Sequence, residues 1–397
     1  MTETPHADVV VVGAGPAGLA AALGCLEAGL APAIVDTSKS ASAEAAKGRS
    51  AALFNKTIDF LQRLGVWDAC HDRAEPLRAL QFIDDTGRRL RAPDCVFHAE
   101  EIGETAFGYN ISNADLVAAL KAEVEKQKLQ VLTPGPVIGF RETATKASLR
   151  FADGTELAAP LAIAADGRMS ALREAAGFRK LAWTYDQVAL AASFRHARPH
   201  RGVCIEFHRG AGPLTLVPLP GNESSFVWVE RKSEAERLAA LDDEAFAREI
   251  EKASHLALGG VSEVSGRGRF PLSSLAVRDY GRARVALAGE AAHVVPPIGA
   301  QGLNLGFRDV ETLLRLLAEA REKGADIGSE DLLRDYTAAR RGDIVSRTLG
   351  ADVLNRSLLS NFLPLQAARG LGLYALGSIG PLRRAFMRRG MAPAGLV

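Results

Sequence analysis

The clearest pattern of hydrophobic positions lies near the N-terminus. Residues 9–12 are four consecutive valines, which is typical of a strand that is buried on both faces. A glycine-rich turn follows, then an apolar run that predicts a helix ending near Gly29, and then a second apolar strand that ends at Asp36. Strand, helix and strand in this order predict a βαβ unit with parallel strands.

Gly13, Gly15 and Gly18 give the turn the spacing Gly-x-Gly-x-x-Gly. In a βαβ unit the first glycine permits a tight turn, the second lets a diphosphate approach the backbone, and the third lets the helix pack closely on the strand. The helix N-terminus attracts the negative diphosphate, and the carboxylate of Asp36 can accept hydrogen bonds from a ribose. The unit therefore predicts a dinucleotide-binding site.

Residues 9–26 carry no charge and are nearly long enough to span a membrane. Because glycines and Pro16 interrupt them, we interpret them as a strand and a helix and predict no membrane span. The residues that precede them lack the basic segment of a signal peptide. The four cysteines are isolated and have no metal-ligand spacing, which favours a reducing compartment. These features predict a cytoplasmic protein.

Two later segments also combine an apolar strand, a glycine turn and a helix. In the first, residues 161–165 lead into Asp166 and Gly167, and Asp166 is also a candidate helix N-cap. In the second, the strand "RVALAGE" leads into "AAHVVPPIGAQG", and the next helix is expected to begin near Gly302. The N–H groups of residues 302–304 would then face a partial negative charge.

Other parts of the chain show different patterns. Residues 186–231 alternate short β-branched and aromatic runs with glycine and proline breaks, which predicts an antiparallel sheet. Residues 77–93 predict two further strands around an Asp-Asp-Thr-Gly turn. Residues 234–253 predict a charged, amphipathic surface helix.

Length and charge narrow the function classes. A chain of 397 residues is long enough for two or three domains. Its 48 lysine and arginine residues nearly balance its 47 aspartate and glutamate residues, so the composition indicates no basic surface for nucleic acid. A nucleic-acid partner is therefore not expected.

The three strand–turn–helix segments, in this order, resemble those of the group A flavoprotein monooxygenases, which have the p-hydroxybenzoate hydroxylase fold. The similarity is closest to the ubiquinone-biosynthesis hydroxylases. The matching segments are residues 13–18, 166–173 and 289–304, and residues 48–67 and 107–120 are similar to further segments of that branch. The resemblance implies an α/β fold in which a Rossmann-like FAD-binding domain is interleaved with an antiparallel-sheet substrate domain and followed by a helical C-terminus.

The same resemblance implies a division of the chain into discontinuous parts. We expect the FAD-binding domain to comprise residues 1–75, 100–180 and 266–345. Residues 76–99 and 181–265 are expected to form the substrate domain, and residues 346–397 the C-terminal helical segment.

The resemblance also implies FAD as the cofactor. NADPH or NADH is expected to be a transient electron donor, because the chain has no second complete Gly-x-Gly-x-x-Gly unit. No side chain is assigned a catalytic role, since the chemistry belongs to the flavin; Pro296 and Gly302 are expected to shape the flavin pocket. The residues expected to bind FAD are Gly13, Gly15, Pro16, Ala17, Gly18, Asp36, Arg49, Asp166, Gly289, Glu290, Pro296, Gly299, Gly302, Leu303 and Asn304.

The activity implied by the resemblance is hydroxylation of a phenolic ring by molecular oxygen through a hydroperoxide at flavin C4a. The expected substrate is a polyprenylated phenol or quinone precursor of ubiquinone, and a ubiquinone-biosynthesis complex is a possible partner. Two alternatives stay open. One is another FAD oxidoreductase, such as a soluble aromatic hydroxylase, an epoxidase or a prenyl reductase. The other is a non-catalytic flavin-binding subunit of a quinone-biosynthesis complex.

Several side chains in the matching segments have two interpretations. Residues 48–67 resemble a helix whose arginine, here Arg49, contacts FAD in the family, but a surface salt bridge is the alternative. His293 either transfers a proton or packs beneath the loop that holds the flavin. Arg168 and Arg173 either contact a pyrophosphate or NADPH, or are solvated helix charges. Glu290 replaces the aspartate of the family and is one methylene longer.

The apolar blocks of residues 353–391 predict short helices, which Pro364, Gly370 and Pro381 separate. The hydrophobic residues at the start of this region are candidates for the core or for a dimer surface: Leu358, Leu359, Phe362 and Leu363. The alternative is peripheral contact with the inner face of the membrane, since four arginines cluster beside two apolar residues. These residues are Arg383, Arg384, Arg388 and Arg389, beside Phe386 and Met387.

Overall fold

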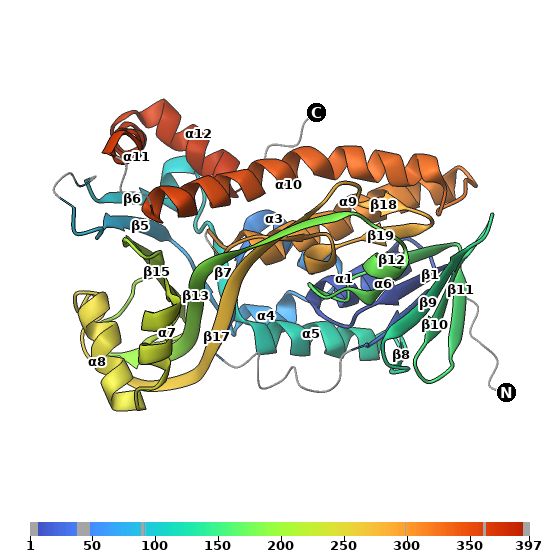
Figure 1. Ribbon diagram of the computed structural model, residues 1–397, viewed down its shortest axis with the longest axis horizontal. Coiled ribbons are helices and arrows are strands. Elements are labelled where there is room, and N and C mark those ends of the chain that lie inside the picture. The colour runs from blue at the N-terminus through green and yellow to red at the C-terminus, as the bar shows by residue number, and fades with distance from the viewer. Residues whose placement is uncertain are drawn as a thin grey trace.

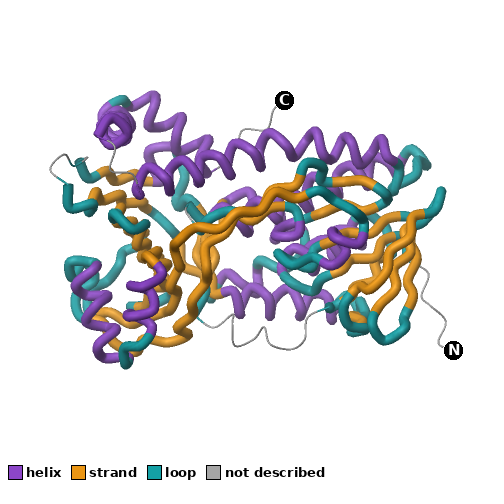
Figure 2. The backbone as a smooth tube through the Cα atoms, in the orientation of Figure 1, coloured by secondary structure: helices purple, strands orange, loops and turns teal. Residues whose placement is uncertain are grey.

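The computed structural model describes residues 7–37, 48–88, 91, 93–297, 299–359 and 363–391. The molecule is elongated, with a sheet and its covering helices at one end and a second sheet backed by two helices at the other (Figure 1). One long helix runs along the whole upper side of the view, and two strands cross between the ends (Figure 2). The mixed α/β class agrees with the prediction.

The first sheet is built around the predicted βαβ unit. β1 (Val9–Val12), α1 (Pro16–Glu27) and β2 (Pro32–Val35) follow each other as expected. The sheet has six strands in the order β18-β19-β12-β1-β2-β8, and all pairs are parallel except that of β18 with β19. The remaining strands are β8 (Val131–Leu132), β12 (Leu161–Ala164), β18 (Gly281–Arg282) and β19 (Val285–Leu287).

Helices and two small sheets complete this end of the molecule. α1 packs between α5 (Asn113–Lys126) and α9 (Gln301–Glu322), and every residue of β1 and β12 in the sheet is buried. One small sheet joins β9 (Val137–Glu142), β10 (Ala147–Phe151) and β11 (Glu156–Ala159). The other joins β3 (Ser50–Phe54), β7 (Gly108–Ser112) and β4 (Ala74–Pro76). Along the chain, α3 (Asn55–Arg63) follows β3, and α4 (Asp68–His71) precedes β4.

The second large sheet has eight strands in the order β20-β17-β13-β16-β15-β14-β5-β6. It is antiparallel as predicted, except that β5 pairs with β14 in parallel. The predicted helix over residues 234–253 is two helices, because Asp242 caps a new helix by accepting a hydrogen bond from the N–H of Ala245. The elements are β5 (Ala79–Asp84), β6 (Cys95–His98), β13 (Lys180–His196), β14 (Val203–His208), β15 (Pro213–Leu219), β16 (Glu223–Arg231), α7 (Lys232–Ala239), α8 (Asp243–Ala253), β17 (Val261–Val277) and β20 (His293–Val294).

The two faces of this sheet have different neighbours. Alternate side chains such as Phe226 and Trp228 pack against α7 and α8. Val227 and Val229 point to the opposite face, where they form a small apolar cluster with β13 and β17. This opposite face, on which Tyr185, Val227 and Phe270 are only partly buried, is the candidate wall of a substrate pocket.

Strands and helices continue across the expected domain boundaries. β13 and β17 are each 17 residues long and pair along most of their length, connecting the two ends of the molecule (Figure 1). The boundary expected between residues 265 and 266 falls inside β17, and that between residues 345 and 346 falls inside α10 (Glu330–Leu359). Shared elements rather than linkers join the two parts.

The C-terminal helices agree with the prediction at Pro364 and Pro381 and differ from it at Gly370. α11 (Leu363–Ser378) and α12 (Gly380–Met391) begin next to Pro364 and Pro381, and Gly370 lies inside α11. The prolines start these helices rather than end them, because a first-turn residue has no intrahelical partner for its N–H. Leu358 is buried, whereas Phe362 lies outside the described residues and the side chains of Leu363 and Arg389 are not described. Within the described ranges, no helix is long and apolar enough to cross a membrane.

Candidate functional site

The first glycine segment forms a tight turn between β1 and α1. Gly13 has a φ of 116°, and its N–H donates to the carbonyl of Val35 at 2.7 Å. A Cβ atom at Gly13 would lie 2.2 Å from the carbonyl oxygen of Ala165, and one at Gly18 would lie 1.9 Å from the carbonyl oxygen of Gly13. Both glycines are thus required by the packing of the chain itself.

Gly15 has a different environment. A Cβ atom there would meet no heavy atom within 4 Å, so this glycine borders open space at the N-terminus of α1. Pro16 occupies the first turn, where its missing N–H costs nothing. Asp36 follows β2, and its N–H donates to the carbonyl of Leu132 at 2.8 Å. The open space beside the unpaired N–H groups of α1 fits a diphosphate.

The second segment places Asp166 beside this turn. Its Oδ2 atom accepts a hydrogen bond from the N–H of Leu172 at 3.3 Å, while Oδ1 is buried without a partner among the described residues. The N-cap of α6 (Ala171–Ala175) is Ser170, whose Oγ accepts from the N–H of Arg173. Burial raises the pKa of Asp166. A hydroxyl of the cofactor would satisfy the unpaired oxygen.

Arg173 is not a solvated helix charge, so one of the two expectations for it is wrong. Its side chain is fully buried, and its guanidinium donates to the carbonyl of Ala291 at 3.1 Å and to that of Arg168 at 3.0 Å. An arginine seven residues after Asp166 gives no sign of this role, because its acceptors are two backbone carbonyls and the adjacent carboxylate of Glu174 at 3.0 Å. Arg173 fastens the second segment to the third.

The third segment contains a loop that we call the flavin loop, residues 289–301. It contains a short helical turn, η2 (Gly289–Ala291), then β20, and then Pro296, which is buried. Gly299 and Ala300 have φ angles of 69° and 53°, a left-handed turn from which α9 begins. Because α9 begins at Gln301, the unpaired N–H groups of its first turn belong to residues 300–303, which include Gly302 and Leu303.

The side chain of Asn304 is engaged within the protein, which leaves only its backbone for the expected contact with the cofactor. Its side-chain amide donates to the carbonyls of Ala52 and Ala300, both at 2.8 Å. Its oxygen accepts from the N–H of Phe54 at 3.0 Å and from Oγ1 of Thr57 at 2.8 Å. All four hydrogen bonds that an asparagine side chain can make are used. Asn304 therefore ties α9 to β3 and α3.

The three segments meet in one place. The Cβ position of Gly289 lies 3.3 Å from the Cβ atom of Ala17, at the start of α1. The backbone of Ala165 touches Gly13, and Arg173 reaches Ala291. The expected diphosphate site, the middle motif and the flavin loop thus border a common space, as a single bound dinucleotide requires.

Glu290 lies in the third segment, and Arg49 lies immediately before strand β3. The carboxylate of Glu290 is half exposed and lies 3.8 Å from Nε of Arg168, so its extra methylene extends it toward the middle motif. Arg49 precedes strand β3 rather than lying in a helix, which corrects the expectation from residues 48–67. Its guanidinium stacks on Phe270 of β17 at 4.8 Å from the ring centre. Arg49 therefore stands where the two parts of the molecule meet, beside the apolar face of the large sheet.

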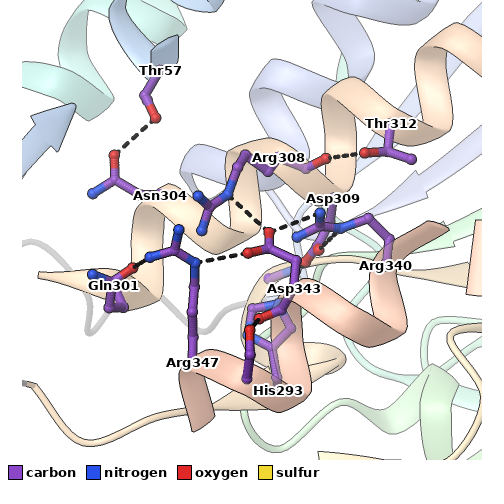
Figure 3. A network of polar contacts seen from close by, with 12 residues as sticks. Thr57, His293, Gln301, Asn304, Arg308, Asp309, Thr312, Arg340, Asp343 and Arg347 are labelled. Atoms are coloured by element: carbon purple, nitrogen blue, oxygen red, sulfur yellow. Dashed lines mark hydrogen bonds and ion pairs between the residues drawn. The ribbon is translucent and has the colours of Figure 1, made fainter. Parts of the chain in front are cut away.

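His293 is packed in the interior, in line with one of its two interpretations, and it is close to a buried carboxylate. Its side chain is 1% exposed, and its Nε2 atom lies 2.6 Å from Oδ2 of Asp309 (Figure 3). Asp309 is fully buried, accepts from the N–H of Gly289 at 3.0 Å, and pairs with Arg340 of α10 at 2.8 Å. Sequence reasoning missed Asp309 and Arg340, because charged residues along a helix are usually solvated.

The comparisons with known proteins agree with this geometry. The FAD binding domain family matches residues 6–348. Ubiquinone hydroxylase UbiL of Rhodospirillum rubrum is 33% identical over 97% of this chain and 89% of its own length. The 3-demethoxyubiquinol 3-hydroxylase of Escherichia coli is 30% identical over 97% and 98%.

Solved structures show the same fold at low sequence identity. The p-nitrophenol 4-monooxygenase PnpA of Pseudomonas putida superposes with a TM-score of 0.78 at 19% identity, covering 99% of both chains. Klebsiella pneumoniae HpxO, solved with FAD and uric acid, superposes with a TM-score of 0.75 at 20% identity, covering 98% of this chain and 97% of its own. The glycine turn, the unpaired oxygen of Asp166 and the start of α9 fit FAD. The chain belongs to the FAD binding domain family of flavoprotein monooxygenases, in the branch of the ubiquinone-biosynthesis hydroxylases.

Proposed function

We propose that this protein is an FAD-dependent monooxygenase that hydroxylates the phenolic ring of a polyprenylated ubiquinone precursor. The observation that carries the proposal is the similarity to ubiquinone hydroxylases over 97% of the chain, which includes the large sheet as well as the FAD-binding part. The apolar face of that sheet, next to Arg49, supports a site for a hydrophobic ring.

Different residues of the chain would bind FAD and exclude water from the site. Bound FAD would take electrons from NADPH or NADH and supply the oxygen-transfer chemistry. Gly15 and the N-terminus of α1 would hold its diphosphate, and Asp166 a hydroxyl. The N–H groups of residues 300–303 would hold the edge of the ring that becomes negative on reduction, because the partial positive charge of a helix N-terminus stabilises an anion. The apolar cluster around Val227 and Val229 would exclude water.

A single-turnover assay under isotopically labelled oxygen tests this function. The purified protein with FAD, NADPH or NADH, and a prenylated phenol should yield a product heavier by one labelled oxygen atom, and the phenol should accelerate oxidation of the nicotinamide. A reduced or epoxidised prenyl chain would identify a different FAD oxidoreductase. Failure of both nicotinamides to reduce the flavin would favour the non-catalytic subunit.

We also propose that the surface formed by α11 and α12 contacts an anionic membrane. Several of its apolar side chains are 43–68% exposed: Leu371, Tyr374, Ile379, Leu382 and Phe386. Arg384 and Arg388 lie beside them and are exposed, whereas Arg383 is not part of the surface. Arg383 pairs with Glu101 at 2.5 Å and stacks on Phe97, so it fastens α12 to the substrate sheet. Apolar side chains flanked by arginines suit the headgroup region.

The double variant Leu371→Glu, Leu382→Glu is expected to lower binding to anionic lipid vesicles at least tenfold in co-sedimentation. The two carboxylates would be repelled by the lipid and could not enter its apolar region, while Arg383 and buried Met387 would still hold α12. Ile138→Glu is the matched control, since this side chain is 57% exposed on β9 at the other end of the molecule. Equal vesicle binding by both variants and the parent would contradict the membrane contact.

A further inference from the structure

α9 and α10 share a buried network of charged side chains beneath the flavin loop (Figure 3). Asp343 of α10 lies among three arginines. Its carboxylate accepts from Nη1 of Arg340 at 3.0 Å and from Nε of Arg347 at 2.7 Å, and it lies 3.2 Å from Nε of Arg308. Arg340 connects this group to Asp309. None of these side chains is more than 17% exposed.

The network holds the flavin loop at both ends. At the first end, Oδ2 of Asp309 accepts from the N–H of Gly289 at 3.0 Å and lies 2.6 Å from His293. At the other end, Nη1 of Arg347 donates to Oε1 of Gln301 at 2.5 Å. The first and last residues of the loop are thereby connected through Asp309, Arg340, Asp343 and Arg347 (Figure 3).

The charges of the network are retained despite their burial. Burial raises the pKa of Asp309 and of Asp343, but the charges of His293 and Arg340 on the first, and of Arg308 and Arg340 on the second, hold both pKa values below the ordinary one. Burial lowers the pKa of Arg308 to about 10, which still leaves it charged at neutral pH. Buried ion pairs add little stability compared with apolar packing, so their value lies in fixing one geometry.

The same helix also contacts the substrate sheet. Asp352 of α10 accepts a hydrogen bond from the hydroxyl of Tyr185 on β13 at 2.5 Å. Asn355 of α10 donates to the side-chain oxygen of Gln187 on β13 at 2.9 Å, and both are buried. α10 is continuous over its 30 residues, so its middle is bound to the flavin loop and its C-terminal part to the sheet.

We propose that Asp343 and Arg347 are positioning residues for oxygen transfer. They fix the flavin loop to α10, and α10 fixes the loop at a constant distance from the face of the sheet that holds the substrate. This inference rests on the proposed function, because the distance between loop and sheet matters only if the substrate binds on that face. The binding of FAD by the loop does not depend on which substrate is used. Neither residue touches the reacting atoms in this scheme; both act through the loop.

Arg347→Met tests the proposal, because it removes the link to Gln301 and leaves Asp343 paired with Arg308 and Arg340. We expect the dissociation constant of FAD to rise about tenfold and the visible circular dichroism of the bound flavin to weaken. The fraction of NAD(P)H oxidation that releases hydrogen peroxide should at least double. Arg347→Lys retains the charge and should recover part of each effect. The melting temperature of the apoprotein should fall equally little in both variants.

Asp331→Asn is the matched control, because Asp331 pairs with Arg334 on the same helix but is exposed to solvent. It should leave all four measurements unchanged. The proposal is overturned if Arg347→Met keeps the parental FAD affinity, dichroism and peroxide fraction. It is also overturned if the apoprotein of Arg347→Met melts far below that of Arg347→Lys, since the arginine would then support the fold alone. FAD affinity and dichroism are measured without substrate. If the proposed substrate is wrong, both should therefore still change in Arg347→Met, and the error would appear only in the labelled-oxygen assay.

Discussion

Gly15→Val is expected to yield a folded protein that no longer retains FAD. The Cβ atom of the variant would enter space that holds no heavy atom of the chain within 4 Å, and the φ of −80° at this position suits valine. The same space is where a diphosphate would approach the N–H groups of α1. A hydrogen bond to a charged group contributes about 1.5–3 kcal/mol, so losing two should weaken binding by at least roughly 100-fold. Flavin absorbance after gel filtration and a titration with FAD measure the effect.

Valine variants at two other glycines serve as controls for this experiment. Gly210 also has no heavy atom within 4 Å of its Cβ position, and it lies in the hairpin between β14 and β15, so Gly210→Val should keep both fold and FAD. Gly18→Val should fail to fold, because its Cβ atom would lie 1.9 Å from a backbone oxygen. A yellow Gly15→Val protein with the parental flavin content would show that the diphosphate lies elsewhere.

A prenylated phenol is expected to be turned over with a kcat/KM at least 100-fold higher than that of its unprenylated parent. A buried CH₂ group contributes about 0.8 kcal/mol, so one fully buried isoprene unit of five carbons is worth roughly 4 kcal/mol, or about three powers of ten. The exposed apolar side chains of α11 and α12 offer a surface for such a chain. Steady-state kinetics with detergent-solubilised phenols of increasing chain length measure the effect.

The coupling of NAD(P)H oxidation to hydroxylation provides the control for this comparison. With the short phenol, NAD(P)H oxidation should be slow or should release peroxide, because a loosely held ring is not kept beside the flavin. Equal kcat/KM values for the two phenols, with tight coupling in both cases, would place the protein among the soluble aromatic hydroxylases. The FAD assignment would not be affected by that outcome.

The FAD-binding unit was predictable because its signals are local. Four buried valines, the spacing of Gly13, Gly15 and Gly18, and the strand ending before Asp36 all lie within one short stretch of chain, and each has a meaning without distant partners. The strands and helix starts of the two later segments could be predicted for the same reason. The resemblance to a known family then supplied the cofactor and the order of the parts.

The roles of single polar residues could not be predicted in this way. Asn304 lies in a glycine-rich motif and was expected at the cofactor, but its side chain is saturated by β3 and α3, which lie about 250 positions earlier in the chain. Arg173, for which a solvated helix charge was one of two expectations, is instead buried against two backbone carbonyls and Glu174. Arg49 precedes a strand, because residues 50–54 pair with β7.

The sequence by itself determined that this chain folds into a βαβ dinucleotide unit, an antiparallel sheet and a helical C-terminus, since turn chemistry and the alternation of apolar residues act over a few positions. Only the tertiary structure decided that Asp309, Arg340, Asp343 and Arg347 form one network under the flavin loop. A charged side chain on a helix is stable either in water or beside an opposite charge, and the amino-acid sequence of the helix does not distinguish the two cases. Which of the two occurs depends on the helix that packs against it, and for α9 that helix is α10.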